Sequence, residues 1–361
     1  MTNIGLYIHI PFCISKCPYC DFYSSPNREN KERYIKALCR HIENEPYKYD
    51  SVFIGGGTPS VLSPEDFAEI FDSLKGKISE GAEITTELNP SDVSLEFFEG
   101  LKRLTPINRI SLGVQSATDE RLRFLGRRHS VKAAKNAIIC AKKAKFCNIS
   151  ADFIIGLPKE TEEEIEANLE FIKETKPSHI SAYILKVEEN TPFFKSGIGE
   201  KLDDDLISDH YLLLSEGLRN LGFNHYEISN FALPEKESRH NLKYWHCEEY
   251  LGIGPGAHSF IDGKRFFIER NTEEYIKNIE TGVSPYKGFE TGGDENERIM
   301  LSLRLNEGVL LSVLKEETQK RIKALAPKYE TAGLLTLKGD RLSLTEKGFL
   351  LSNSIITDLI F

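Results

Sequence analysis

The chain of 361 residues is long enough for one large domain with additions or for about two to three domains. Its 40% hydrophobic and 28% charged residues are typical of a folded globular protein and not of a disordered chain. The formal charge of -9 argues against nucleic acid as a partner, because an acidic surface repels phosphate groups. No stretch approaches the roughly 20 apolar residues of a membrane helix, and the N-terminal residues lack the features of a secretion signal.

The chain contains seven cysteines, an odd number without the spacing of a secreted disulfide framework. Three of them lie within residues 13–20. The others, which we expect to be buried thiols, are Cys39, Cys140, Cys147 and Cys247. This usage predicts a reducing compartment. Because the first strand is expected almost at Met1, with no room for a targeting peptide, the predicted location is cytoplasmic.

The first half of the chain alternates short apolar runs with amphipathic segments. Runs rich in Ile, Val and Phe predict strands that are buried on both faces. The predicted strands are Ile4–Ile10, Ser51–Ile54, Glu83–Leu88, Arg109–Val114, Ile149–Ile155 and His179–Leu185. Helix-start signals lie between them, at Ser25-Pro26, Ser63-Pro64-Glu65, Ser130 and Thr161. Six such units within residues 1–222 fall short of the about 250 residues of an eight-fold barrel, so we predict an α/β fold with a partial (β/α)6 barrel.

The pattern changes after a predicted helix at Asp203–Leu221. Residues 223–293 contain a segment at Asn224–Phe231 and then a polar, glycine-rich stretch, which we interpret as an α+β extension. Residues 294–361 predict a small winged-helix-like C-terminal domain. Its expected elements are helices at Glu297–Leu305 and Leu311–Leu325 and a hairpin formed by Leu334–Leu337 and Arg341–Leu344. Because this domain has no dense basic patch, we expect it to serve packing or interaction and not DNA binding.

The cysteines Cys13, Cys17 and Cys20 have the spacing C-x3-C-x2-C. Three thiolates on one short loop can each bind one iron of a cubane cluster and leave the fourth iron open to a chelating molecule. The alternative is a structural zinc site closed by His9 or Asp21, although zinc sites usually contain paired C-x2-C units. The spacing favours iron–sulfur.

Distinctive residues also follow the other predicted strands, at the barrel edge where ligand chemistry gathers. Gly55-Gly56-Gly57-Thr58 follows the second strand, Glu87 ends the third, Gln115 ends the fourth, and Arg127 lies a little further on. Each has an ordinary alternative: a simple turn for the glycines, a cap or surface charge for Glu87, and a solvated helix end for Arg127. Asp152 lies inside an apolar strand, where a carboxylate is costly unless it binds something.

The C-x3-C-x2-C motif after the first strand and the Gly-Gly-Gly-Thr-Pro run resemble the radical S-adenosylmethionine (SAM) superfamily. The resemblance implies a [4Fe–4S] cluster on Cys13, Cys17 and Cys20, with SAM chelating the fourth iron. In that family the reduced cluster cleaves SAM to a 5′-deoxyadenosyl radical. The resemblance also implies SAM contacts from Tyr7, Tyr19, Gly56, Gly57, Thr58, Glu87, Gln115, Arg127 and Asp152. Tyr19 would lie near adenine or pack over the cluster.

Within that superfamily the chain is similar to the anaerobic coproporphyrinogen III oxidases, with two departures. Those oxidases carry a further cysteine where this chain has Phe22, and they have a longer N-terminal segment. Both features match the HemW branch of heme chaperones, as does the H-N-x-x-Y-W motif that begins at His240. The resemblance implies that His240 binds heme iron and that Tyr244 and Trp245 offer aromatic faces to the porphyrin. Packing in the core is the alternative for His240, and His246 and Cys247 are adjacent candidate ligands.

A glycine-rich stretch, Leu251–Ser259, superficially resembles a dinucleotide-binding fingerprint. Pro255 interrupts it and no apolar helix clearly follows, so we exclude a nicotinamide cofactor and expect a loop near the SAM site.

The predicted function is a heme chaperone that binds heme, a [4Fe–4S] cluster and SAM and delivers heme to recipient hemoproteins. The prediction leaves open SAM cleavage, a homodimer and transient contact with membrane hemoproteins. The main alternative is an oxygen-independent coproporphyrinogen III oxidase. A radical enzyme with an unrelated substrate and a zinc-binding interaction module are further alternatives.

Overall fold

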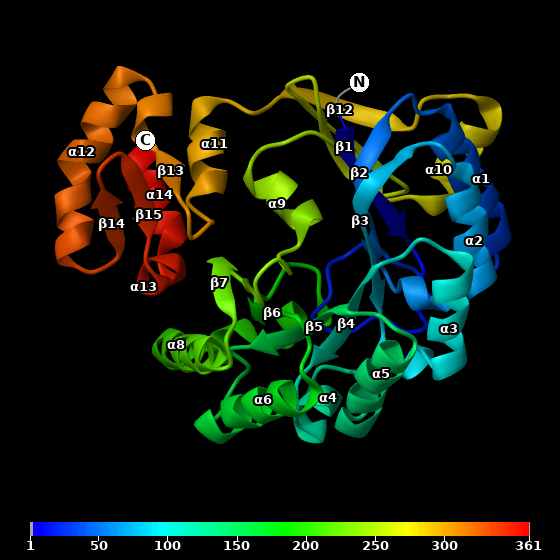
Figure 1. Cartoon of the computed structure of the whole chain (residues 1–361), viewed down its shortest axis with the longest axis horizontal. Coiled ribbons are helices and arrows are strands. Elements are labelled where there is room, and N and C mark those ends of the chain that lie inside the picture. Colours follow the sequence, from blue (N-terminus) through cyan, green and yellow to red (C-terminus); the bar gives the residue numbers. More distant parts are fainter. Residues whose placement is uncertain (1–2, 361) are drawn as a thin grey trace.

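The computed structural model describes residues 3–360 and contains a large curved sheet with helices on its outer face (Figure 1). The first six strands pair side by side in parallel and in chain order. They are β1 (Asn3–Ile10), β2 (Lys48–Gly56), β3 (Ile78–Leu88), β4 (Arg109–Gln115), β5 (Asn148–Ile155) and β6 (His179–Ile184). All six predicted strands are therefore confirmed, and the α/β partial barrel with them.

Helices connect the parallel strands and bury their apolar faces against the sheet. They are α1 (Lys31–Asn44), α2 (Pro64–Ser73), α3 (Leu95–Leu104), α4 (Asp119–Phe124), α5 (Val131–Lys143) and α6 (Glu162–Thr175). The start signals at Ser63, Ser130 and Thr161 are confirmed; at Ser63, for example, the hydroxyl accepts from the Asp66 N–H. Short 3-10 turns lie at Pro59–Val61 and Pro90–Asp92.

The predicted helix start at Ser25-Pro26 is wrong, because α1 begins at Lys31. The Ser25 N–H instead donates to the Pro11 carbonyl at 2.8 Å, and the Ser25 carbonyl accepts from the Cys13 N–H at 3.0 Å. These two bonds close the loop that carries the cysteines. The segment after Ser25 must leave that loop before a helix can form.

The predicted extension contributes strands to both edges of the main sheet, which has 12 strands among the described residues. Beside β1 lie β9 (Tyr250–Ile253), β10 (His258–Ile261), β11 (Lys264–Ile268) and β12 (Tyr286–Thr291). Beside β6 lie β8 (Asn230–Ala232) and β7 (Asn224–Glu227). The polar stretch after Phe231 is thus regular structure, and its residues Leu251, Ile261 and Tyr275 join the barrel core.

Four further helices accompany these strands. They are α7 (Pro192–Lys195), α8 (Asp204–Asn220), α9 (Arg239–Trp245) and α10 (Thr272–Thr281), with a 3-10 turn at Gly199–Lys201. The helix α9 carries the H-N-x-x-Y-W motif, and it contacts β2 from the inner side of the sheet (Figure 1). Sequence periodicity did not predict α9, because seven residues are too few to show a repeat.

The C-terminal residues form a separate small core around a three-stranded sheet. Its elements are α11 (Glu295–Ser302), β13 (Val309–Leu310), α12 (Glu316–Thr331), β14 (Leu335–Lys338), β15 (Arg341–Leu344), α13 (Glu346–Leu350) and α14 (Ser352–Ile360). The predicted hairpin is confirmed, with Leu335 opposite Leu344. The predicted second helix starts later than expected, because Leu311–Val313 forms a 3-10 turn first.

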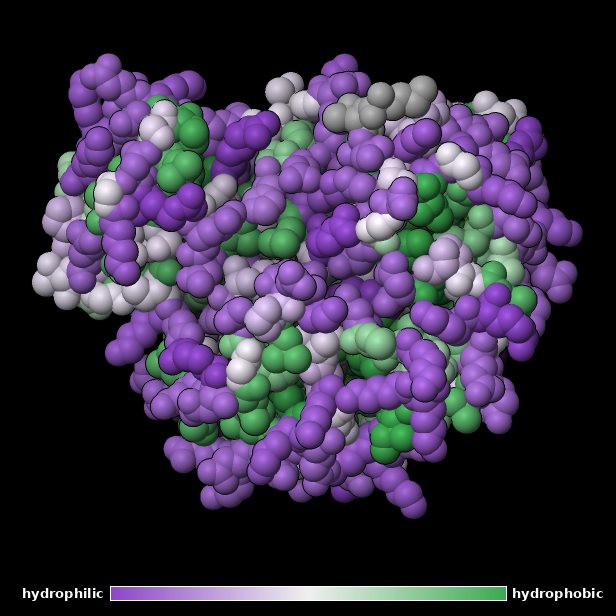
Figure 2. All heavy atoms as spheres, in the orientation of Figure 1, coloured by the Kyte–Doolittle hydropathy of each residue, from purple (hydrophilic) through white to green (hydrophobic). Residues whose placement is uncertain are grey.

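The remaining cysteines are all free thiols, but only Cys140 and Cys247 are buried. Cys39 is half-buried and Cys147 is exposed, which corrects the expectation that all four would be buried. Figure 2 shows hydrophilic residues over most of one face, with hydrophobic side chains visible in recesses between the elements. Among residues 3–360, no helix has the length and apolar character that crossing a membrane requires.

Candidate cluster and SAM site

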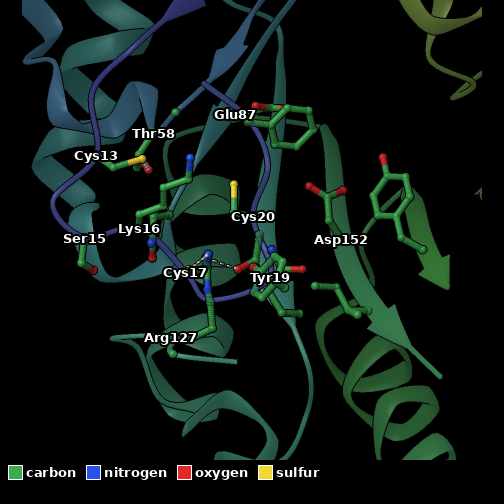
Figure 3. A pocket seen from close by; sticks show the side chains of 18 of the residues that line it. Cys13, Ser15, Lys16, Cys17, Tyr19, Cys20, Thr58, Glu87, Arg127 and Asp152 are labelled. Atoms are coloured by element: carbon green, nitrogen blue, oxygen red, sulfur yellow. Dashed lines mark hydrogen bonds between the residues drawn. The ribbon is translucent and has the colours of Figure 1, made fainter. Parts of the chain in front are cut away.

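The three motif cysteines lie on the loop after β1, at the carboxyl ends of the parallel strands. The Cys13 Sγ lies 3.2 Å from the Thr58 hydroxyl, and the Cys17 Sγ accepts from the Arg127 guanidinium at 3.7 Å. Arg127 and Thr58 thus place a cation and a hydroxyl beside two of the three sulfur atoms. Figure 3 shows Cys13 and Cys20 directed into a cavity bordered by Thr58, Glu87, Arg127 and Asp152.

That cavity has a volume of about 1330 Å³, including space open to solvent, and residues of the five neighbouring strands β2 to β6 line it. The structure brings together all three cysteines and most of the predicted SAM contacts. Those that line it are Tyr19, Gly56, Gly57, Thr58, Glu87, Gln115, Arg127 and Asp152. Tyr7 instead lines a neighbouring cavity, on the other side of Phe22. The convergence follows from the parallel sheet, since its strands all end at the same edge.

The glycines after β2 are required by close backbone packing. A Cβ at Gly57 would lie 2.6 Å from the Phe12 carbonyl oxygen, and one at Gly56 would lie 2.5 Å from the His9 ring. The Gly57 N–H donates to Ile10, and the Thr58 N–H donates to Phe12. The glycine run is therefore more than a turn: it holds the cysteine loop against β2.

Two half-buried carboxylates face the cavity. Glu87 accepts from the Gly56 N–H at 3.2 Å, and burial, assisted by the charge of Asp152, raises the pKa of Glu87 from 4.5 to about 7. Asp152 accepts from the hydroxyls of Ser111 at 2.8 Å and Ser150 at 3.0 Å, and burial raises its pKa too. Neither has an ion-pair partner among the described residues. The charge of Arg109 partly offsets the effect of burial on both pKa values, and carboxylates without a direct ion pair suit a positively charged ligand.

The neighbouring side chains of Arg127 and Arg128 have different partners in the structure. The Arg127 guanidinium donates to the Gly113 carbonyl at 2.9 Å as well as to Cys17, whereas Arg128 pairs with Asp92 at 2.6 Å. Arg127 is thus fixed beside a cluster cysteine and is not a solvated helix end. Gln115, at the end of β4, has a φ of 69°, a left-handed conformation that is strained for a residue with a side chain.

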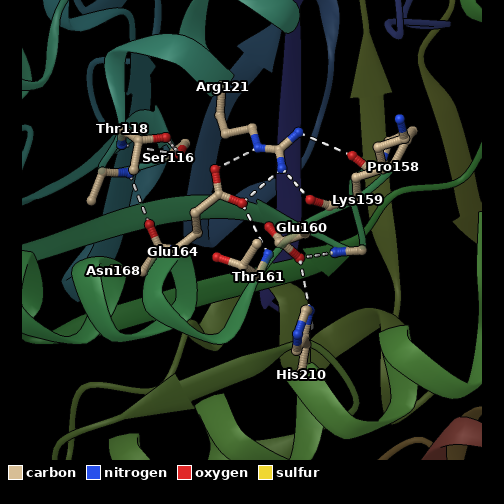
Figure 4. Close-up of polar contacts among 12 residues, drawn as sticks. Ser116, Thr118, Arg121, Pro158, Lys159, Glu160, Thr161, Glu164, Asn168 and His210 are labelled. Atoms are coloured by element: carbon tan, nitrogen blue, oxygen red, sulfur yellow. Dashed lines mark hydrogen bonds and ion pairs between the residues drawn. The ribbon is translucent and has the colours of Figure 1, made fainter.

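A polar network of residues outside the cluster cavity contacts the turn after β5 (Figure 4). The Glu160 carboxylate accepts from the Gly156 N–H at 2.7 Å and lies 3.6 Å from the His210 ring, both side chains being buried. The neighbouring Arg121 pairs with Glu164 at 2.7 Å and donates to the Pro158 carbonyl at 3.0 Å. This network fixes the strand that carries Asp152. The sequence analysis missed it, because its members are far apart in the chain.

The comparisons with known proteins agree with this geometry. Residues 7–172 match the radical SAM superfamily, and residues 296–351 match the HemN C-terminal domain. The chain is 33% identical over 373 residues to the heme chaperone HemW of Mycobacterium tuberculosis, covering 99% of this chain and 94% of the relative. The chain belongs to the radical SAM superfamily, in the HemW family. Membership of this superfamily implies a [4Fe–4S] cluster and SAM.

Other relatives in the HemW family are similar over their full length. The heme chaperone HemW of Escherichia coli is 32% identical, with 99% of this chain and 98% of the relative covered. That of Lactococcus lactis is 33% identical, with 97% and 95% covered. Among solved structures, the E. coli coproporphyrinogen III oxidase HemN shares the fold, with a TM-score of 0.81 and 21% identity over 99% of this chain and 90% of that chain.

Neither candidate fourth ligand of a zinc site, His9 or Asp21, lines the cavity that holds the cysteines. The His9 ring nitrogens bond to the Tyr7 hydroxyl at 3.0 Å and the Tyr23 carbonyl at 2.8 Å. Asp21 lies 3.5 Å from Arg270. The donor set that remains is three sulfur atoms around an open cavity, which fits the cluster of a radical SAM protein.

The histidine of the HemW-type motif lies in the core. His240 is fully buried, with one ring nitrogen 2.9 Å from the Ser51 hydroxyl and the other 2.8 Å from the Tyr244 hydroxyl. Its ring also stacks on Phe53 at 5.3 Å between centroids. In this conformation neither nitrogen is free for heme iron. Ligation by His240, as predicted from the motif, would require α9 to open, and it stays a prediction.

Proposed function

We propose that this protein is a heme chaperone, which binds heme beside a [4Fe–4S] cluster and SAM and delivers it to recipient hemoproteins. The observation that carries the proposal is the full-length similarity to chaperones of the HemW family, at 33% identity over 99% of the chain. A second observation supports it. Phe22, where the related oxidases carry a further cysteine, is 67% exposed and borders both the cluster cavity and its neighbour.

In this proposal Cys13, Cys17 and Cys20 hold the cluster, and the Arg127 guanidinium donates to the Cys17 sulfur. Glu87 and Asp152, which both line the cluster cavity, bind the positively charged part of SAM. When bound, the cluster supplies a single electron next to SAM. The electron would serve heme transfer, a change of heme oxidation state or SAM cleavage.

The test is an anaerobic hemin titration of the cluster-reconstituted protein, followed by the Soret absorption. The loaded protein is then mixed with an apo-cytochrome b, and heme transfer is compared with heme release into buffer. Saturable one-to-one binding and transfer faster than release would support the proposal. Absence of saturable binding would refute it. In that case decarboxylation of coproporphyrinogen III, with SAM and a strong reductant, would test the oxidase alternative.

A further inference from the structure

A second cavity lies beside the cluster site, where the added strands join β1. It has a volume of about 300 Å³, at the lower end of the range of about 300–1,000 Å³ typical of cofactor sites. The residues that line it are Tyr7, His9, Phe22, Tyr23, Tyr244, Tyr250, Gly256, His258 and Arg270. Most are aromatic, and Phe22 lines the cluster cavity as well. A planar apolar molecule in this cavity would therefore lie next to the cluster.

His258 is the histidine of this cavity whose imidazole is free. It begins β10, opposite Phe267 on β11, and its exposed ring packs 5.7 Å from that of Phe267. Among residues 3–360 no hydrogen-bond partner of the His258 side chain is found, whereas both nitrogens of His9 are engaged. Burial, together with the charges of Arg270 and Arg265, lowers the pKa of His258. The ring is therefore neutral at pH 7, the form that binds iron.

The walls of the cavity match the rest of a heme molecule. The rings of Tyr244 and Tyr250 meet edge to face at 4.5 Å, and the exposed side chain of Phe22 also lines the cavity. Such aromatic side chains contact a porphyrin face. The Arg270 side chain is 59% exposed and only loosely paired with Asp21, at 3.5 Å. An arginine in this state is a suitable partner for a porphyrin carboxylate.

We propose that this cavity is the heme site, with His258 as the axial ligand of the iron and Arg270 as a partner of a propionate. The inference rests on the proposed function, since it assumes that the chain binds heme. In this inference His240 is not the heme ligand that its motif predicts. His240 is a positioning residue: it bonds to the Tyr244 hydroxyl and so holds one aromatic wall of the cavity in place.

The experiment is an anaerobic hemin titration of four cluster-reconstituted proteins: the natural chain, His258→Ala, His240→Asn and His246→Ala. His246 is an exposed histidine just after α9 that pairs with Glu307, and its variant tests the alternative that this adjacent candidate binds the iron. Affinity is read from the Soret absorption, and ligation from the electron paramagnetic resonance of the ferric heme. Circular dichroism verifies that each variant is folded.

His258→Ala should weaken binding at least tenfold and lose the imidazole signature, and free imidazole should restore that signature. His240→Asn should weaken binding yet retain the signature, and His246→Ala should match the natural chain. A natural spectrum and affinity in His258→Ala, or loss of the signature in His240→Asn alone, would overturn the inference while leaving heme binding intact. Failure of the natural chain to bind hemin would instead refute the proposed function and this inference with it.

A second, independent experiment tests the role of Arg270. Hemin and its dimethyl ester are compared in the natural chain, in Arg270→Gln and in the control Arg33→Gln, whose arginine pairs with Glu280 away from the cavity. The natural chain and the control should prefer hemin about tenfold, and Arg270→Gln should lose most of that preference. An equal preference in all three would remove Arg270 from the site.

Discussion

The raised pKa of the Glu87 carboxyl should make SAM binding dependent on pH. With a pKa of about 7, roughly a tenth of the Glu87 side chains are ionised at pH 6 and roughly nine tenths at pH 8. SAM carries a positive sulfonium group, so it binds the ionised form more tightly. Because apparent affinity scales with the competent fraction, it should rise about ninefold between these pH values, or about 1.3 kcal/mol.

The substitution Glu87→Gln keeps the size and the acceptor for the Gly56 N–H but removes the charge at every pH. The ninefold rise should disappear, and the affinity at pH 8 should fall by about the same factor. Any pH dependence that remains belongs to other groups, including the SAM amino group. The difference between the two proteins therefore isolates Glu87.

The assay is anaerobic calorimetry of SAM binding to the cluster-reconstituted proteins at pH 6, 7 and 8. Glu160→Gln is the matched control, because burial also raises the pKa of Glu160 to about 7 but this residue does not line the cluster cavity. The control should keep the natural pH dependence. The same slope in the natural chain and in Glu87→Gln would refute the reasoning that Glu87 faces SAM as the titrating group.

Three other predictions concern the same region. Glu160→Gln should raise the free energy of unfolding at pH 8 by up to about 3 kcal/mol and leave it nearly unchanged at pH 4, because the stability contributed by protonated Glu160 is lost as pH rises from 4.5 to about 7. Urea unfolding checks this, and an equal effect at both pH values would contradict it. Gly57→Ala should prevent cluster reconstitution, since its Cβ would overlap the Phe12 backbone, whereas Gly199→Ala, whose Cβ would only touch Val187 at 3.9 Å, should not. Normal iron content in the first variant would disprove the packing argument. Arg127→Gln should lower the reduction potential of the cluster, because a cation beside Cys17 is lost. Redox titration measures the potential, and a shift of the same size in Arg128→Gln would point to a general charge effect.

The sequence alone determined the barrel and the composition of the cluster cavity. Apolar runs such as Ile149–Ile155 have no stable place except between two layers, so strand positions can be read from local composition. Parallel strands all end at one edge of the sheet. Residues that follow different strands, such as Cys13, Glu87 and Asp152, were therefore expected to meet, and they line one cavity.

Only the tertiary structure decided how the remaining residues are used. Ser25 has the chemistry of a helix cap, but its backbone closes the cysteine loop instead. His240 has the chemistry of an iron ligand, yet Ser51 and Tyr244 occupy its nitrogens, while His258 is left free beside Arg270. The hydrogen-bonding capacity of a side chain is a local property. Which partner satisfies it, and how far burial shifts a pKa such as that of Glu87, depends on distances that exist only once the whole chain is packed.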